Sequence, residues 1–359
     1  MTDAGTPSPT PGPGSVGPTS TSVTSRRVPL RERLPVISQL RLSVGLQRGM
    51  LVTGLAITTV FILTAIFAPW IAPYGFAQSS VDGVSFGTQQ PPNPVNLLGT
   101  TVSGFDVLSR VIWGAQTAIL VIVAAVAFSI FLGIFLGLVS GYFGGWLDRI
   151  LVVICDAIYA FPSLLLAIVI SIVISRGQST LVGGILSAAI AITVVFVPQY
   201  FRVIRAEVVR VKAEPFVESA RVIGVPTSRI LIRHVLRNST RSLPVVVTLN
   251  ASEALLTLAG LGFLGFGIEA TAAAEWGYDL NRSVADVSSG IWWTAVPPGV
   301  AIVLVVLGIT LVGESLNDLS DPRLRRRRSA AKSAKRAARA SGRGSAAIGA
   351  AGSPAGGAS

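Results

Sequence analysis

Six long apolar runs constrain the fold of this chain more than any other feature. Each is about 20 residues or longer, the length that an α-helix needs to cross a hydrocarbon core about 30 Å thick. Because lipid offers no hydrogen-bond partner to the backbone, we expect every run to be helical. The sequence therefore predicts an all-α integral membrane protein with six transmembrane helices, near residues 51–72, 111–139, 150–175, 181–201, 243–268 and 291–312.

The charged residues are also typical of a membrane protein. Hydrophobic residues make up 51% of the chain and charged residues only 13%, whereas soluble domains carry about 25% charged residues. The net charge of +12 raises the question of nucleic acid, but the basic residues lie beside the apolar runs, where they normally signal membrane topology. We therefore expect the lipid bilayer, and no nucleic acid, as a partner.

The distribution of Lys and Arg predicts which way the chain faces. Of the 29 Lys and Arg residues, only Arg110, Arg176 and Arg282 lie on one of the two sides that six spans define. Cytoplasmic loops carry the excess of positive charge, so both termini and the loop 202–241 are predicted to be cytoplasmic. The chain is thus expected to be a multi-pass protein of the plasma (inner) membrane.

Composition divides the chain into three parts. Residues 1–48 and 323–359 lack long apolar runs and are basic, so we predict disordered cytoplasmic tails on either side of a transmembrane domain, residues 49–322. The single cysteine, Cys155, and the single histidine, His234, exclude a disulfide framework and a Cys or His cluster. We expect no metal site and no catalytic residues.

The loop 202–241 carries the signals of two short helices with a tight break. Pro215 suits the first turn of a helix over 215–223, Gly224 is a natural helix end, and Thr227 or Ser228 can cap a second helix over 229–238. Small residues and helical spacing indicate a face for another surface, with Glu218 and Arg221 able to pair across it. Its candidate residues are Pro215, Val217, Glu218, Ser219, Ala220, Arg221 and Gly224. A plain connecting loop is the alternative.

Two segments on the predicted external side of the membrane, opposite the loop 202–241, are polar. Residues 73–104 contain Pro91-Pro92-Asn93-Pro94, which indicates an irregular loop. Residues 269–289 hold four acidic residues against one arginine: Glu269, Glu275, Asp279 and Asp286. This acidic segment is typical of an ordinary solvated loop, and a docking face for an external partner is the alternative.

The second span has glycines four residues apart, Gly133 and Gly137. A Gly-x-x-x-Gly pattern permits close contact between membrane helices. We expect this pattern to mark packing within the chain or against a second membrane subunit, rather than a binding site.

The motifs resemble those of a known family. Glu218-Ser219-Ala220, with Gly224 four residues after Ala220, resembles the EAA loop of ATP-binding-cassette (ABC) importer permeases. Further motifs resemble the peptide/nickel class, above all the second permease of dipeptide and oligopeptide importers, over about residues 50–323: Asn96–Thr100, Gly104–Arg110, Trp113–Ala115, Gly141–Arg149, Asp156–Leu166, Phe263–Gly267, Trp276-Gly277 and Asp321–Arg323. The resemblance implies a type I ABC importer permease fold and half of a path for dipeptides or oligopeptides. Nickel or another small solute is the alternative cargo.

The resemblance also implies partners. No Gly-x-x-x-x-Gly-Lys-Ser/Thr loop occurs, so this chain does not itself cradle ATP phosphates, and ATP and Mg are expected on two separate ABC ATPase subunits. A second homologous permease and an extracytoplasmic substrate-binding protein complete the expected complex. The chain is then a transport subunit without its own ATP site, not an enzyme. Two other classes are the alternatives. A secondary transporter would need inverted repeats and ion sites, which we do not see in the sequence. A membrane enzyme would need a set of catalytic residues, and the chain has a single histidine for it.

Asp156 and Glu253 are ionisable residues inside predicted spans. Burying such a charge in a membrane is costly, so each needs a partner or a watery cavity. Both are candidates for the translocation path, where a carboxylate could meet the amino terminus of a peptide. The alternative is a helix–helix hydrogen bond or a position near the membrane surface.

Four residues depart from the pattern of the family. Thr101 stands where Asp is usual and Phe105 where Arg is usual, which puts the usual external polar network in question. Arg237 replaces a usual Pro after the EAA helix. Leu258 replaces a usual Glu and so removes a polar site from the fifth span.

Overall fold

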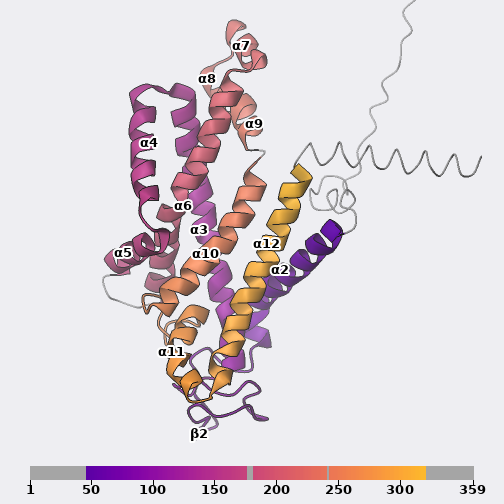
Figure 1. Ribbon diagram of the computed structural model, residues 1–359, viewed down its shortest axis with the longest axis vertical. Helices are drawn as coiled ribbons and strands as arrows, with labels where there is room; N and C mark the ends of the chain where they lie inside the picture. The colour runs from indigo at the N-terminus through magenta and orange to yellow at the C-terminus, as the bar shows by residue number, and fades with distance from the viewer. Residues whose placement is uncertain (1–45, 176–180, 241, 321–359) are drawn as a thin grey trace, which may run out of the picture. The chain divides into compact units, whose positions relative to one another are not determined.

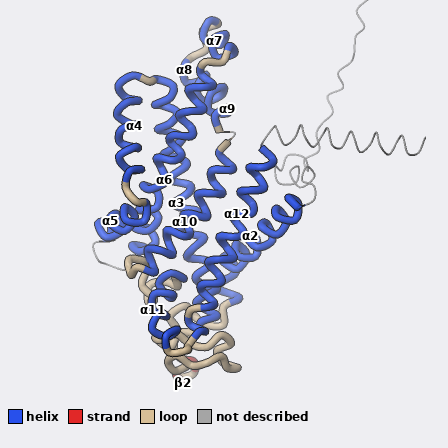
Figure 2. Tube along the Cα trace, viewed as in Figure 1, coloured by secondary structure: helices blue, strands red, loops and turns tan. Residues whose placement is uncertain are grey.

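The computed structural model describes residues 46–175, 181–240 and 242–320, and most of this part of the chain is helical (Figures 1 and 2). The predicted tails fall outside the described residues except for 46–48, so their disorder remains a prediction. The helices are α2 (Leu46–Ile71), α3 (Val107–Phe143), α4 (Gly145–Ala160), α5 (Ser163–Ser175), α6 (Leu181–Lys212), α7 (Pro215–Val222), α8 (Thr227–Arg229), the π-helix η2 (Ile230–Leu236), α9 (Arg237–Ser239), α10 (Leu243–Phe263), α11 (Trp276–Ser288), the 3-10 helix η3 (Trp292–Thr294) and α12 (Val296–Ser320).

The loop between α2 and α3 contains a short hairpin. Its strands, β1 (Ser80–Val81) and β2 (Val84–Ser85), pair antiparallel with Ser80 opposite Ser85 and Val81 opposite Val84. The predicted loop 73–104 is therefore irregular apart from this hairpin and an isolated bridge between Thr100 and Asp106.

Five described helices are long and apolar enough to cross a membrane: α2, α3, α6, α10 and α12. The bent pair α4 and α5 makes a sixth crossing if it is counted as one span. The fold is thus the predicted all-α membrane fold. In Figure 1, α7 lies at one end of these helices, here named the α7 end, while α11 and the hairpin lie at the other, the α11 end.

The structure differs from the sequence prediction in the third span. Instead of one helix over 150–175, α4 and α5 meet at an angle of 99°. Phe161, which precedes Pro162, has φ −81° and ψ 142°, because a following proline disfavours the helical region. We refer to residues 158–166 at this bend as the elbow.

Glycines of α3 determine how closely α3 and α6 pack. A Cβ atom at Gly133 would lie 2.3 Å from Cβ of Tyr200, and one at Gly137 would lie 3.0 Å from Cβ of Ile204. From the first pair to the second, the position moves by four residues on each helix. The side chains of α6 therefore form a ridge that fits a groove left by the glycines of α3. The Gly-x-x-x-Gly pattern is therefore used for packing within the chain.

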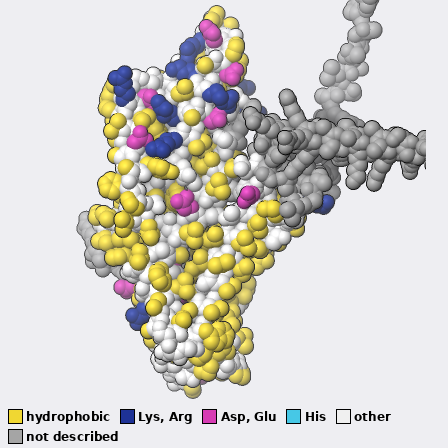
Figure 3. Space-filling model, viewed as in Figure 1, with side chains coloured by type: hydrophobic (Ala, Val, Ile, Leu, Met, Phe, Trp, Pro, Cys, Tyr) yellow, Lys and Arg dark blue, Asp and Glu magenta, His cyan; other side chains and the backbone are white. Residues whose placement is uncertain are grey.

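The surface reflects a membrane setting. Figure 3 shows a broad apolar flank between the two ends, and Lys and Arg side chains gathered around α4, α6 and the α7 end. Large side chains that are exposed on α3, such as Phe128, Phe131 and Phe135, contribute to the exposed apolar surface. An exposed apolar surface of this kind is suited to lipid or to another membrane subunit.

Candidate functional site

The predicted break after the first loop helix is built by glycine. Gly224 has φ +77°, a left-handed conformation that side chains with a Cβ rarely adopt. The N–H of Gly224 donates to the carbonyl of Arg221 at 3.0 Å, and the N–H of Val225 donates to that of Ala220 at 3.1 Å. This pair of bonds is a Schellman motif, and it ends α7 where the sequence predicts.

The candidate residues of α7 divide between its two faces. Val217 and Ala220 are buried against this chain, so they anchor the helix instead of offering a free docking face. Pro215, Glu218, Ser219, Arg221 and Gly224 are exposed. The outward surface also holds three apolar side chains that the sequence analysis did not select, namely Phe216, Val222 and Ile223; the last two are 83% and 78% exposed.

Arg221 turns to α3 rather than pairing with Glu218. Its guanidinium donates to the hydroxyl of Tyr142 at 3.4 Å and lies 5.6 Å from the centre of that ring. Lys212, at the end of α6, donates to the backbone carbonyl of Tyr142 at 2.5 Å. Tyr142 therefore links α7 to both α3 and α6.

The second loop helix is not the regular α-helix that the sequence predicts. Residues 227–239 form α8, η2 and α9 without a break, and the N-cap residue is Pro226, which makes no side-chain capping bond. Thr227 and Ser228 lie inside the helix. Ile230 and Val235 are both buried although they lie five residues apart, a spacing that a wider π-turn can place on one side. Arg237 is exposed in α9.

A cavity of about 200 Å³ lies at the elbow, between α4, α5, α6 and α10. Glu253 of α10 lines it together with Gln199 of α6 and side chains of the elbow. Asp156 does not line this cavity. It forms an ion pair with Arg202 at 2.7 Å, and both side chains are about half exposed. Arg202 also lies 4.4 Å above the ring of Tyr159, which belongs to the cavity wall.

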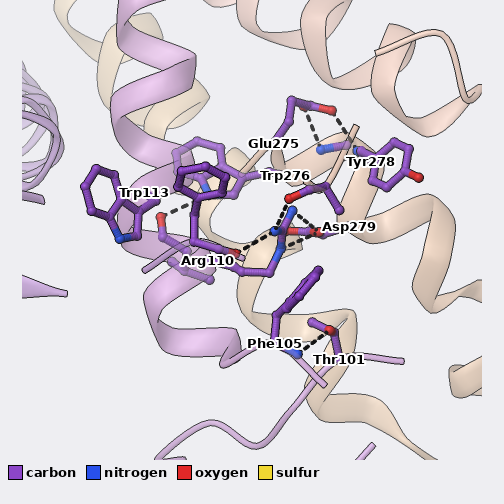
Figure 4. A network of polar contacts seen from close by, with 12 residues as sticks. Thr101, Phe105, Arg110, Trp113, Glu275, Trp276, Tyr278 and Asp279 are labelled. Carbon is purple, nitrogen blue, oxygen red and sulfur yellow. Dashed lines mark hydrogen bonds and ion pairs between the residues drawn. The ribbon is translucent and has the colours of Figure 1, made fainter. Parts of the chain in front are cut away.

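The α11 end contains a buried polar network (Figure 4). The side chain of Arg110 donates through Nε to both carboxylate oxygens of Asp279 at 2.8 Å, and through Nη1 to the carbonyls of Phe76 and Ala270. Arg110 is 1% exposed. Sequence reasoning treated it as one of three external charges and missed this role. The acidic segment 269–289 was the signal that could have suggested a partner.

The acidic residues of this segment are mostly not solvated, contrary to the solvated-loop prediction. Glu275, Asp279 and Asp286 are buried, and Gln89 Nε2 donates to Asp286. Glu275 is the N-cap of α11 and accepts from the N–H groups of Gly277 and Tyr278 at 2.8 and 2.7 Å. The carboxylates hold the loops of this chain together.

Burial governs the protonation of two of these carboxyls. It raises the pKa of Glu275 to about 8, although the two backbone N–H groups at the start of α11 favour the charged form. Burial also raises the pKa of Asp279, and the adjacent Arg110 acts in the opposite direction. At neutral pH we therefore expect a neutral Glu275 beside the Arg110–Asp279 ion pair.

Two of the departures from the family pattern belong to this network. The hydroxyl of Thr101 accepts from the N–H of Phe105 at 3.1 Å, and Arg110 lies 5.5 Å from the centre of the Phe105 ring. In this chain, Thr101 thus closes a turn beside the network and the Phe105 ring faces the guanidinium. Leu258, a third departure, is buried in α10 and adds an apolar contact there.

Comparison with known proteins identifies the family. Residues 130–326 match the family described as "Binding-protein-dependent transport system inner membrane component", and residues 46–92 match the "N-terminal TM domain of oligopeptide transport permease C".

Individual relatives agree with this match. The chain is 35% identical over 274 residues to the "Dipeptide transport system permease protein DppC" of Alkalihalophilus pseudofirmus, covering 76% of this chain and 86% of that protein. It is 37% identical over 279 residues to the "Glutathione transport system permease protein GsiD" of Shigella flexneri, covering 78% of this chain and 88% of that protein. The chain therefore belongs to the family of binding-protein-dependent inner membrane components, the permease subunits of ABC importers.

Proposed function

We propose that this chain is one of two permease subunits in an ATP-driven importer of dipeptides or oligopeptides. A second homologous permease completes the path, two ABC ATPases supply ATP and Mg, and an extracytoplasmic binding protein delivers the peptide. The protein lies in the plasma (inner) membrane with both termini and the α7 end in the cytoplasm. The names of the relatives, which refer to dipeptide and glutathione transport, support a peptide cargo.

The observation that carries the coupling proposal is the exposed apolar surface of α7. Phe216, Val222 and Ile223 project from a helix whose other face is anchored by Val217 and Ala220. An apolar helix face of this kind fits a groove on a partner. The surrounding basic residues (Figure 3) support a cytoplasmic location, where an ATPase subunit can reach it. The exposed Glu218 and Ser219 lie beside this apolar surface.

The contacts of α7 suggest how its movement reaches the path. Tyr142 links α7 to α3 and α6, and the segment α8–η2–α9 leads directly towards α10. Helices α6 and α10 then line the elbow cavity through Gln199 and Glu253. A shift of α7 driven by an ATPase would therefore move walls of this cavity. Asp156 and Glu253 remain the proposed polar residues of the path.

A charge placed on the exposed surface of α7 tests the coupling role. We expect Val222→Asp to lower peptide uptake and substrate-stimulated ATP hydrolysis roughly tenfold or more, since an unpaired carboxylate is costly to bury in an apolar groove. The measurement uses the complete importer, with its ATPases and binding protein, reconstituted in liposomes.

Val84→Asp is the matched control, because Val84 is 71% exposed but lies in the hairpin at the α11 end. It should leave ATPase association unchanged. Normal ATPase stimulation in the assembled Val222→Asp complex would contradict docking through α7.

A further inference from the structure

The elbow cavity combines one carboxylate with three aromatic rings. Its polar groups come from Glu253 on α10, Gln199 on α6 and Ser163 on α5, and its rings belong to Tyr159, Phe161 and Phe196. Glu253 stands at the midpoint of α10, which runs from Leu243 to Phe263. A carboxylate at this depth in a membrane requires a partner or a watery cavity.

The charges around the cavity leave Glu253 uncompensated. The neighbouring Asp156 and Arg202 neutralise each other in an ion pair. Within residues 46–175, 181–240 and 242–320, no ion pair includes Glu253. The cavity therefore holds an acidic side chain that no basic side chain pairs with in the described residues, and this side chain is exposed to an incoming cation.

The walls of the cavity favour an organic ammonium group. Aromatic rings attract ammonium groups through their faces, and the side-chain oxygens of Gln199 and Ser163 can accept hydrogen bonds from the three N–H donors of such a group. The volume of about 200 Å³ is below the 300–1,000 Å³ that is typical of sites for whole small molecules. It suits one end of a peptide and a small first side chain.

We propose that the elbow cavity receives the N-terminal ammonium group of the translocated peptide. Glu253 forms the ion pair with this group, and Gln199 and Ser163 accept its remaining N–H groups. The three rings lie beside the first residue, with Phe196 buried in the wall and Tyr159 and Phe161 on the exposed side. This inference rests on the proposed function, because it assigns a part of the peptide to a position on the path.

The first experiment compares peptides with a free and an acetylated amino terminus in the reconstituted importer. We expect Glu253→Gln to lower uptake of the free peptide roughly tenfold, as expected for the loss of a charge-assisted contact, and to leave uptake of the acetylated peptide nearly unchanged. The result is the ratio of free-peptide uptake to acetylated-peptide uptake, compared between the parent importer and Glu253→Gln. The binding protein has its own preference between the two peptides, but this preference is the same with both permeases and cancels in the comparison. Equal effects on both peptides would overturn the proposal.

Glu314→Gln is the matched control, since Glu314 is an exposed glutamate of another membrane helix, α12, and does not line the cavity. It should not distinguish the two peptides. Failure of Glu253→Gln to assemble with the second permease would indicate that a side chain of that subunit pairs with the carboxylate, and this outcome would also overturn the proposal.

A second measurement does not depend on the acetylated peptide. Two peptides with free amino termini carry a photoreactive side chain either at the first or at the last residue, and labelled segments are mapped by mass spectrometry. We expect the first probe to label residues 158–166 in the parent protein and much less in Glu253→Gln. Equal labelling by both probes contradicts the inference. If no peptide is imported by the fully assembled parent complex, the proposed peptide function itself fails.

Discussion

At the scale of single residues, the buried charges of the described part of the chain lie at the α11 end. Arg110 is inaccessible to solvent, yet its guanidinium donates to Asp279 and to two backbone carbonyls. A buried charge is tolerated when it is paired and hydrogen-bonded. The bond joins residues 169 positions apart in the sequence, so it fixes the beginning of α3 to α11 directly.

The neighbouring Glu275 should make stability depend on pH. Its pKa is about 8 in the folded protein, against 4.5 without burial, so the folded state holds a proton that the unfolded state releases. This contribution to stability is complete below pH 4.5, declines as pH rises, and is lost by about pH 8.

We therefore expect the Tm of the purified protein to fall between pH 5 and pH 8. Above pH 8, titration of Glu275 should lower the Tm no further. Glu275→Gln, which keeps a neutral side chain at every pH, should flatten that part of the profile. An identical slope in the parent protein and the variant, measured by thermal unfolding in detergent, would rule out Glu275 as the titrating group.

At the scale of elements, glycine spacing determines how closely α3 and α6 pack. Because a Cβ at Gly133 would lie 2.3 Å from Cβ of Tyr200, Gly133→Ala must push α3 and α6 apart. We expect a loss of about 1–3 kcal/mol in the free energy of unfolding, the usual cost of overpacking.

Gly49→Ala provides the comparison in a helix of the same domain, since nothing lies within 4 Å of a Cβ at Gly49. It should be neutral or slightly stabilising, because alanine favours helices over glycine by about 1 kcal/mol. Denaturant unfolding of both variants, followed by circular dichroism, gives the difference; equal stability would mean that α3 and α6 are less tightly packed than their structure indicates.

The sequence predicts the elements better than their bends. Apolar length alone located the membrane helices, since every lipid-exposed backbone must be helical, and Gly224 correctly marked the end of α7. Pro162 did not reveal the 99° bend, because a proline in a membrane helix can produce anything from a slight kink to a full break, and neighbouring helices decide which. The π-turn of η2 likewise depends on burying Ile230 and Val235 together.

The candidate residues were predicted less completely than the fold. The motif identified α7, but burial of Val217 and exposure of Val222 depend on how the helix rests on α6 and η2, which local spacing does not specify. The pairing of Arg110 with Asp279 depends on a contact between distant segments. Glu253 was selected for its charge in an apolar run, while the aromatic walls around it come from α4, α6 and the link between α4 and α5, and could not be assembled from one sequence window.

At the scale of the whole membrane domain, Tyr142 connects α7 with α6, one of the helices that line the elbow cavity. Tyr142→Leu should keep an apolar side chain, though a smaller one, and remove the ring face that Arg221 and Lys212 contact. We expect peptide uptake per ATP hydrolysed to fall roughly two- to thirtyfold, the range seen when residues between coupled sites are changed.

Tyr142→Phe keeps the aromatic face and loses only the weak hydroxyl contact, so its uptake per ATP should remain close to that of the parent importer. Both ratios are obtained by measuring transport and hydrolysis in the same liposomes. If Tyr142→Leu transports as many peptides per ATP as Tyr142→Phe, the link through Tyr142 does not transmit the movement.

The elbow has a consequence for how this protein is made. Helix α4 has 16 residues and α5 has 13, which correspond to lengths of about 24 Å and about 20 Å. Neither half alone reaches across a hydrocarbon layer about 30 Å thick. During biosynthesis this pair should therefore settle in the membrane only after α6 and α10, which pack against it, have been made.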